Sequence, residues 1–112
     1  MKKIEAFIRP EKVGAVRRAL EKVDINGLNI TQVDGHGKQK GTVQKFGGSE
    51  YKVGILPKTK LEIVVRDNDV TGVVDTIIEA AKTGEIGDGK IFISAVEEAI
   101  RIRTQEKGEN AL

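Results

Sequence analysis

Apolar residues follow two periods along this chain, and both periods occur twice. Residues 3–9 and 60–66 are apolar-rich runs broken by single charges, a pattern typical of strands. Apolar residues at helical spacing follow each run. They are Val13, Val16, Leu20 and Val23 in the first copy and Val70, Val73, Val74, Ile77, Ile78 and Ala81 in the second. The copies align at an offset of 57 residues, Lys3 on Lys60, which indicates a duplicated unit.

The helix boundaries follow from proline, glycine and capping residues. The first helix is expected to begin near Pro10, since proline suits the first helical position, and to end at residues 26–27. The second is expected to be capped from residues 67–69 and to end at residues 83–84. Strands should follow the helices at residues 28–34 and 90–95. The order β-α-β-β-α-β predicts an α+β ferredoxin-like sandwich with both helices on one sheet face.

The other sheet face is expected to carry apolar side chains as well. Phe7, Val64 and Phe92 fall on it, because they alternate with inward positions. The inward positions are Ile8, Ile63, Val65, Ile91 and Ile93. Uncovered apolar sheet surface usually marks an interface, so we expect a homo-oligomer in which sheet packs against sheet.

Length and composition narrow the class of protein. The 112 residues predict one domain spanning positions 1–112. A formal net charge of +2 lacks the basic excess of nucleic-acid binders, so no such partner is expected. No cysteine and one histidine exclude thiolate zinc and multi-histidine metal sites. Without an apolar run of 18 residues or a recognisable signal peptide, we expect a cytoplasmic protein with no direct membrane insertion.

Glycine is the unusual component of the chain. It supplies 13 of the 112 residues, and six of the 13 lie between positions 35 and 54. The stretch 36–54 also carries a local charge of +3. A connection of this length inside a compact domain is usually functional or disordered. The segment at about 36–55 is therefore a candidate functional loop, with a flexible hairpin extension as the alternative.

Three segments have the composition of an anion site. In residues 35–41 (GHGKQKG) and 83–90 (TGEIGDGK), glycines let backbone N–H groups converge on an anion and lysines add charge. In Arg101-Ile102-Arg103, alternation would place both guanidinium groups on one side of an extended segment. Together the segments suggest a polyphosphate ligand. Ordinary turns, a helix C-cap and a solvated edge strand are the respective alternatives.

No catalytic machinery is recognisable in the sequence. Ser49 and Ser94 lack a nucleophile-elbow context, and His36 has no paired carboxylate. We therefore expect a non-enzymatic protein without catalytic residues. Tyr51, at the expected loop tip, is a candidate partner anchor or modification site, or it folds back onto the domain.

These motifs together resemble the PII family of nitrogen-regulatory signal proteins over essentially the whole chain. Residues 83–92 (TGEIGDGKIF) match the family signature throughout, and residues 35–41, 56–58 and 100–104 match as well. The resemblance implies a sheet-packed homotrimer that binds ATP or ADP competitively in three clefts between subunits. The residues it implies for the nucleotide are Asn29, Gly35, Gly37, Lys38, Val64, Gly87, Asp88, Gly89, Lys90, Arg101 and Arg103.

The resemblance also implies an effector site for 2-oxoglutarate. Gln39 would help to ligate the Mg²⁺ that bridges ATP and 2-oxoglutarate, and Lys58 would pair with a carboxylate of 2-oxoglutarate. Lys40, Gly41 and Gly87 would line the same site. No redox cofactor is implied. Ligands at this place would select among conformations of the loop, which is a population shift.

The loop at about 36–55 corresponds to the T-loop with which the family docks on partners. The resemblance implies an ammonium transporter or a nitrogen-metabolism enzyme as the partner, with recruitment to the membrane through such a transporter. Tyr51 stands where some members are uridylylated, and Ser49 where some are phosphorylated. Gly47 replaces the basic residue usual in this loop.

Two alternatives accompany this reading of the function. Lys38 and His36 resemble the residues found at these positions in a nitrogenase-regulating branch of the family, which is the first alternative. A slow ATPase on the same scaffold is the alternative from a different class. The C-terminal segment, at about 100–112, would contribute arginines to the nucleotide site in either case.

Overall fold

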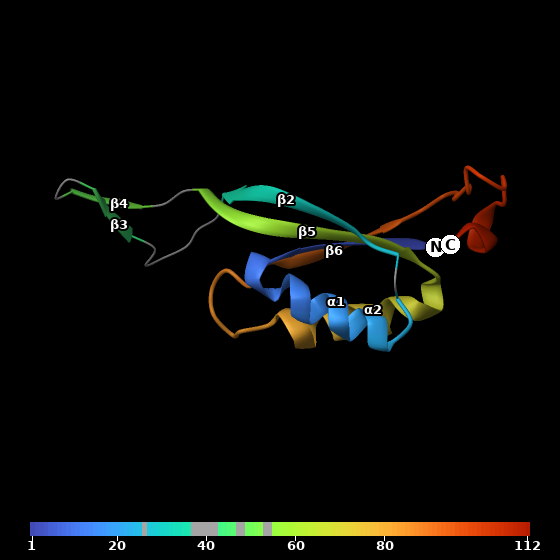
Figure 1. Ribbon diagram of the computed structural model, residues 1–112, viewed down its shortest axis with the longest axis horizontal. Helices are drawn as coiled ribbons and strands as arrows, with labels where there is room; N and C mark the ends of the chain where they lie inside the picture. The colour runs from blue at the N-terminus through green and yellow to red at the C-terminus, as the bar shows by residue number, and fades with distance from the viewer. Residues whose placement is uncertain (26, 37–42, 47–48, 53–54) are drawn as a thin grey trace.

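In the computed structural model, a four-stranded antiparallel sheet carries two helices on one face (Figure 1). The structure describes residues 1–25, 27–36, 43–46, 49–52 and 55–112, with the backbone alone for residues 36, 43–46, 49–52 and 55. The main elements are β1 (Lys2–Ile8), α1 (Val13–Lys22), β2 (Asn29–His36), β5 (Ile55–Val65), α2 (Val70–Ala81) and β6 (Lys90–Ala95). The shorter ones are the hairpin β3 (Val43–Phe46) and β4 (Ser49–Lys52) and the 3-10 turns η1 (Pro10–Lys12), η2 (Asp67–Asp69) and η3 (Gly108–Ala111).

The strands lie in the order β2-β5-β1-β6, so the predicted ferredoxin-like α+β fold is confirmed. Strand β6 has the predicted bounds, whereas β2 and β5 continue beyond theirs, to His36 and back to Ile55. Strand β2 pairs antiparallel with β5 along the whole length of β2, and the β3–β4 hairpin lies between the two strands in the chain (Figure 1). Part of the expected loop is therefore an extension of the sheet.

Alternation along the central strand β1 explains where the core lies. Ile4, Ala6 and Ile8 are buried on the helix side, and they pair with buried positions of β5 in register. The helices complete the core with Val16, Leu20, Val73, Ile77 and Ala81. Sheet and helices therefore bury one shared apolar layer, as the two periods in the sequence predict.

Helix α1 is shorter than the sequence predicts. It ends at Lys22, ahead of the predicted stop, because Asp24 adopts a φ of +62° that no helix accommodates. Val23 lies past that end and is 50 % exposed, so the prediction of its burial was wrong. Val16 and Leu20 are buried as predicted.

Helix α2 differs from expectation at its start and on one side. Asp69 makes no side-chain capping bond, so the predicted cap was wrong, and the turn η2 leads the chain into the helix instead. Ile78 was predicted to be buried and is 46 % exposed, because it lies one helical position round from the buried Ile77. The inward-facing Ile93 on the edge strand β6 is 49 % exposed, so the helices cover it only in part.

The sheet face away from the helices mixes apolar and charged side chains. Phe7 and Phe92 meet there edge to face, with ring centroids 5.9 Å apart, and Phe92 is 56 % exposed. Beside them Glu5 lies 3.4 Å from the Lys3 ammonium and 4.0 Å from that of Lys60. The predicted apolar residues therefore share this face with a group of ion pairs that the alternation argument missed.

Truncating Leu20 and Val23 in turn should distinguish an apolar residue whose predicted burial is confirmed from one whose predicted burial was wrong. We expect Leu20→Ala to lower the free energy of unfolding by about 2–5 kcal/mol, since Leu20 is fully buried. Val23→Ala, the matched control, should cost less than about 1 kcal/mol because half of Val23 is exposed. Urea denaturation monitored by circular dichroism measures both. Equal losses would show that α1 continues through Val23 in solution.

Candidate functional site

The glycine turn of residues 82–89 is organised around one carboxylate. The two oxygens of Asp88 accept hydrogen bonds from the backbone N–H of Thr83 and of Gly84, both at 2.9 Å, and from the Thr83 hydroxyl. These bonds favour the ionised form, so they lower the pKa of Asp88, the Thr83 hydroxyl contributing most. The turn is therefore closed on itself by an anion that stays charged.

Arg9, at the end of β1, fastens this turn to the sheet. Its Nε lies 3.1 Å from Asp88 Oδ1, and its Nη2 donates to the carbonyl of Ile86 at 2.9 Å. From β5, Lys58 donates its Nζ to the carbonyl of Gly87. Two strands thus fix the turn through one cation each, and both cations lie beside the predicted anion site.

The position of Lys58 affects its own ionisation. Burial lowers the pKa of the Lys58 ammonium, and the nearby Arg9 guanidinium lowers it further, whereas Asp88 and Glu11 raise it. The same lysine packs against β2, because a side chain at Gly35 would come within 3.1 Å of its Cγ. Gly35, Lys58 and Gly87 are therefore brought together.

A close backbone contact explains one glycine of the turn. Gly89 has a φ of +102°, and a Cβ there would lie 1.7 Å from the carbonyl oxygen of Phe7. No side chain fits at that distance, so the turn crosses the end of β1 only because this residue is glycine. Lys90 follows at once and opens β6, paired with Phe7.

Three other predicted residues lie along the open face of the sheet. Lys90 pairs with Phe7 near the C-terminal end of β1, whereas Val64 pairs near the N-terminal end of that strand. Asn29 pairs with Glu62, two positions from Val64. Asn29 and Val64 are therefore neighbours, and Lys90 lies toward the glycine turn.

Arg101 and Arg103 do not have the predicted conformation. Residues 102–104 form a turn, closed by the N–H of Gln105 on the carbonyl of Arg101 at 2.8 Å, with Gln105 at a φ of +61°. The prediction of an extended segment was wrong, because Thr104 and Glu106 provide the side-chain bonds of a tight turn.

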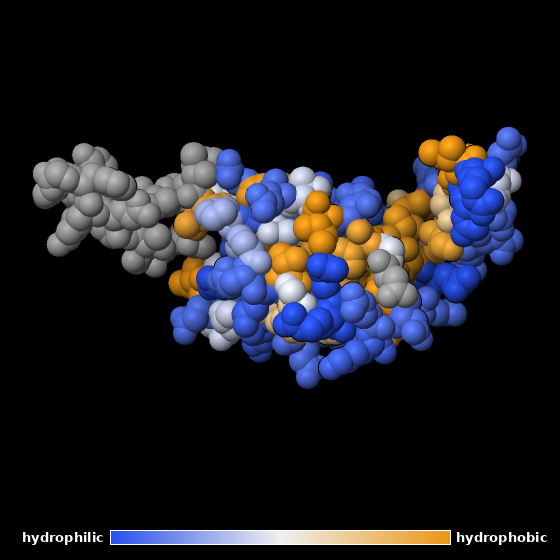
Figure 2. All heavy atoms as spheres, viewed as in Figure 1, coloured by the Kyte–Doolittle hydropathy of each residue, from blue (hydrophilic) through white to orange (hydrophobic). Residues whose placement is uncertain are grey.

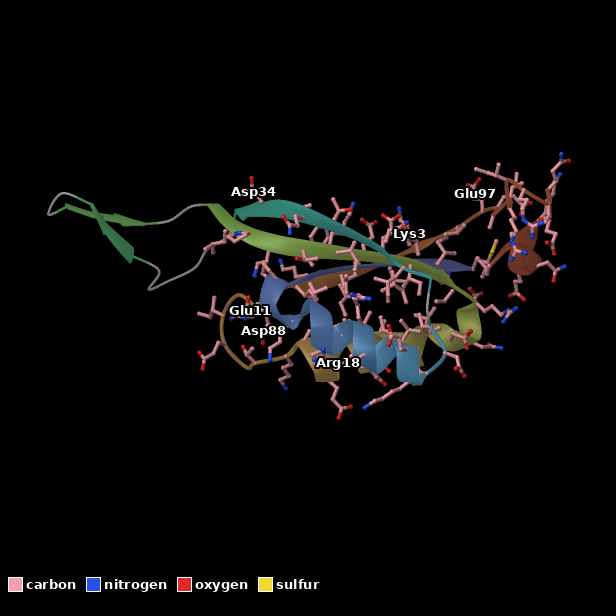
Figure 3. The ribbon with its side chains drawn as sticks, in the orientation of Figure 1. Lys3, Glu11, Arg18, Asp34, Asp88 and Glu97 are labelled. Atoms are coloured by element: carbon pink, nitrogen blue, oxygen red, sulfur yellow. The ribbon has the colours of Figure 1, made fainter. Side chains whose placement is uncertain are left out.

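The two arginines also lie far from the glycine turn of the same chain. The turn enters β6 at Lys90, beside Phe7, and the chain leaves β6 at Ala95, beside Lys2 at the other end of β1. Figure 1 shows the C-terminal segment beyond that end of the sheet, and Figure 3 shows Asp88 and Glu97 at opposite ends. One copy of the chain therefore holds the predicted phosphate ligands at two separate places.

Several predicted residues lie outside the part of the chain that the structure describes. They are Gly37, Lys38, Gln39, Lys40, Gly41 and Gly47. The backbone of Ser49 and Tyr51 is in β4, where Ser49 pairs with Phe46 and Tyr51 with Gln44. The side-chain roles predicted for these two residues stay predictions.

Arg9 and Thr83 lie at the candidate site without having been predicted there from the sequence. Arg9 occurs in the repeat at the position of Arg66, which does not distinguish it. The antiparallel pairing of β1 with β6 supplies the missing signal, because it places the residue after β1 beside the residue before β6. Thr83 could have been found from its place in the glycine string itself.

Comparisons with known proteins agree with this arrangement. The sequence profile of the family described as Nitrogen regulatory protein P-II matches residues 1–106. The chain belongs to the P-II family. It is 57 % identical to the nitrogen regulatory protein P-II of Nostoc punctiforme and 53 % identical to the nitrogen regulatory protein P-II 2 of Methanothermobacter thermautotrophicus. Both comparisons cover the whole of this chain, and they cover 100 % and 97 % of the relatives respectively.

A solved member of the P-II family has the same fold. The crystal structure of Arabidopsis thaliana PII bound to citrate superposes with a TM-score of 0.82 at 42 % identity, over 99 % of this chain and 91 % of that one. The family resemblance inferred from the glycine strings is thereby confirmed, as is its implication of a regulatory role in nitrogen metabolism.

Other features of this P-II chain bear less directly on a ligand. A groove of about 380 Å³ between α2 and β6 is lined largely by apolar side chains, Ile78 and Ile93 among them, and Lys82, Asp88, Gly89 and Lys90 of the glycine turn also line it. Among the described residues, no group of three or more His, Cys, Asp or Glu side chains could hold a metal ion. Within the same residues, no helix is long and apolar enough to cross a membrane.

Substituting the glycine that crosses β1 should destroy the turn. We expect Gly89→Ala to destabilise the P-II fold by about 3 kcal/mol or more, because the new Cβ would overlap the Phe7 carbonyl at an unfavourable φ. Gly72→Ala is the control: nothing lies within 4 Å of its Cβ, and alanine in helix α2 should add about 0.5–1 kcal/mol. Thermal unfolding compares the two. A Gly89→Ala protein as stable as the parent would refute the crossing geometry.

The ionised Asp88 predicts a specific acid response of this P-II protein. Its folded-state pKa is lowered, so its stabilising contribution is complete above the unfolded value near 3.9 and is lost as the pH falls below about 4. Asp88→Asn should therefore lose less stability than the parent in urea titrations between pH 5 and pH 3. Asp75→Asn, which removes an exposed carboxylate of α2, should follow the parent. Parallel curves for Asp88→Asn and the parent would contradict the bonding around Asp88.

Proposed function

We propose that this protein senses nitrogen, carbon and energy status by binding ATP or ADP and, with Mg-ATP, 2-oxoglutarate. The observation that carries the proposal is the glycine turn held in place by Arg9, Asp88 and Lys58. A turn ordered before a ligand arrives presents its backbone without a further loss of entropy on binding. Glycine-rich turns beside cations are suited to phosphate and carboxylate groups.

The nucleotide would lie along the open face of the sheet and reach the turn with its phosphates. Asn29 and Val64 would contact the base, because they are neighbours on that face. Gly87, Asp88, Gly89 and Lys90 would surround the phosphates, together with Gly35, Gly37 and Lys38 from the other glycine segment. The phosphates would thus lie beside the positively charged side chains that surround the turn.

Arg101 and Arg103 would complete the site from a second copy of the chain. They belong to the C-terminal segment, which lies beyond the end of the sheet opposite the turn (Figure 1). Ile102, between them, is 96 % exposed, and Figure 2 shows apolar atoms on the surface of this C-terminal segment. An apolar side chain so placed favours cover by a partner. A homotrimer with its sheets packed together would provide that cover.

The effector site would adjoin the phosphates. Lys58, which donates to the carbonyl of Gly87 in the turn, would pair with a carboxylate of 2-oxoglutarate. Gln39 would ligate the bridging Mg²⁺, with Lys40, Gly41 and Gly87 around the ligand. The citrate in the Arabidopsis relative supports the capacity of this fold to bind a carboxylic acid.

Ligands at the base of the loop would regulate partners through it. Because the β3–β4 hairpin lies between β2 and β5 in the chain, an ordered base would restrict the conformations of the whole loop. An ammonium transporter or a nitrogen-assimilation enzyme would bind only some of those conformations. The protein would act in the cytoplasm, or at the membrane surface when a transporter recruits it. Tyr51 or Ser49 would be the modified residue if the loop is covalently regulated.

Titration calorimetry with 2-oxoglutarate tests the shared-metal mechanism. Binding should be detected with Mg-ATP and lost when Mg-ATP is omitted or replaced by ADP, since the metal bridges both ligands. The coupling must be reciprocal, so 2-oxoglutarate should tighten ATP binding by the same factor. Equal 2-oxoglutarate binding with and without Mg-ATP would show that the mechanism is wrong.

Gln39→Ala should separate the two ligands. We expect the variant to lose 2-oxoglutarate binding at least tenfold, because a metal ligand is removed, and to keep ADP binding within about twofold. Gln32→Ala, on the exposed part of β2, is the matched control and should bind both ligands normally. A variant that loses ADP and 2-oxoglutarate in equal measure would contradict the role of Gln39.

A further inference from the structure

The C-terminal segment forms a closed hairpin around Arg101. The backbone N–H of Arg101 donates to the carbonyl of Glu106 at 2.9 Å, and Ile100 pairs with Lys107 in an isolated bridge. At the base, the N–H of Gly108 donates to the carbonyl of Ala99 at 2.9 Å. The hairpin of residues 99–108 is thus held by its own backbone, and its conformation needs no ligand.

Within this hairpin, Arg101 is already paired with an anion. Its Nη1 lies 2.9 Å from Glu106 Oε1, and its Nη2 donates to the carbonyl of Leu112 at 3.2 Å. The Thr104 hydroxyl donates to the same oxygen of Glu106 at 2.8 Å, so the carboxylate is aimed at the arginine by a second residue. An Arg–carboxylate pair occupies donors that would otherwise bind a phosphate.

We propose that Glu106 is an internal competitor for the nucleotide phosphates at Arg101. This inference rests on the proposed function, in which Arg101 binds a phosphate of a nucleotide held by another copy. A phosphate must then displace Glu106 from Arg101 Nη1, and the lost ion pair weakens nucleotide binding. Thr104 acts as a positioning residue, because its hydroxyl holds the competing carboxylate in place.

The size of the effect follows from the exposure of the pair. The side chains of Arg101 and Glu106 are 39 % and 44 % exposed, so water screens their attraction. Exposed ion pairs contribute little, and the penalty on nucleotide binding should be about two- to fivefold. Glu106 therefore lowers the affinity for the nucleotide without abolishing its binding.

Isothermal titration of ADP into the full-length protein and three variants tests the proposal. Glu106→Gln should bind ADP about two- to fivefold more tightly than the parent. Thr104→Val should shift affinity in the same direction by a smaller factor, although it changes no charge. Glu109→Gln removes the same charge from the same segment, where Glu109 pairs with Arg66 at 3.5 Å, and should leave the affinity unchanged.

The outcomes distinguish the inference from the function on which it rests. Parent protein that binds ADP, with Glu106→Gln equal to or weaker than Glu109→Gln, would overturn the competitor while leaving the nucleotide site intact. Tighter binding by both glutamate variants would reduce the effect to net charge and would overturn it as well. Failure of the parent and every variant to bind ADP would overturn the proposed function, and the competitor with it.

Discussion

The crossing of the glycine turn over the end of β1 is the constraint on which the candidate site depends. The chain passes so close to the Phe7 carbonyl that only glycine fits at position 89. Such a crossing places the turn beside Arg9, the first residue after the strand, which then bonds to Asp88 and to a backbone carbonyl. Lys58 approaches from the next strand. The order of the turn thus derives from the pairing of the central strands, which is the most buried part of the fold.

The same topology separates the charged residues that a nucleotide would need. Strand β6 begins at the glycine turn and ends near the C-terminal segment, so its length divides Lys90 from Arg101. In the proposed function, a single copy would therefore carry residues for the phosphates at both ends and a complete site at neither. The C-terminal segment also carries an apolar side chain, Ile102, that is almost fully exposed. A site shared between copies resolves both features.

The fold could be predicted from the sequence because its signals are periodic and duplicated. The core of β1 and the stripe of Val16 and Leu20 follow directly from alternation and helical spacing. Predictions failed at Val23 because the chain reverses at the next residue, a backbone event that hydrophobicity does not encode. The extended conformation predicted for Arg101 was wrong for a related reason. Alternation of residues does not reveal the side-chain bond by which Thr104 helps to close a turn.

The site was only partly predictable, because contacts between distant strands decide it. The glycine strings and Lys58 were recognisable as a pattern, whereas Arg9 gains its role only when β1 and β6 are paired. The bonds of Asp88 likewise depend on the closure of a turn that composition cannot describe.

Mixing two defective variants tests whether the nucleotide site is shared between copies of the chain. Lys90→Ala removes a residue of the glycine turn, and Arg103→Ala removes one from the C-terminal segment. Neither variant should bind ADP appreciably alone. After the two are unfolded and refolded together in equal amounts, about a quarter of the sites in a cyclic oligomer should combine an intact turn with an intact arginine and bind ADP. Mixed oligomers that bind no ADP beyond the sum of the separate variants would show that each site lies within one chain.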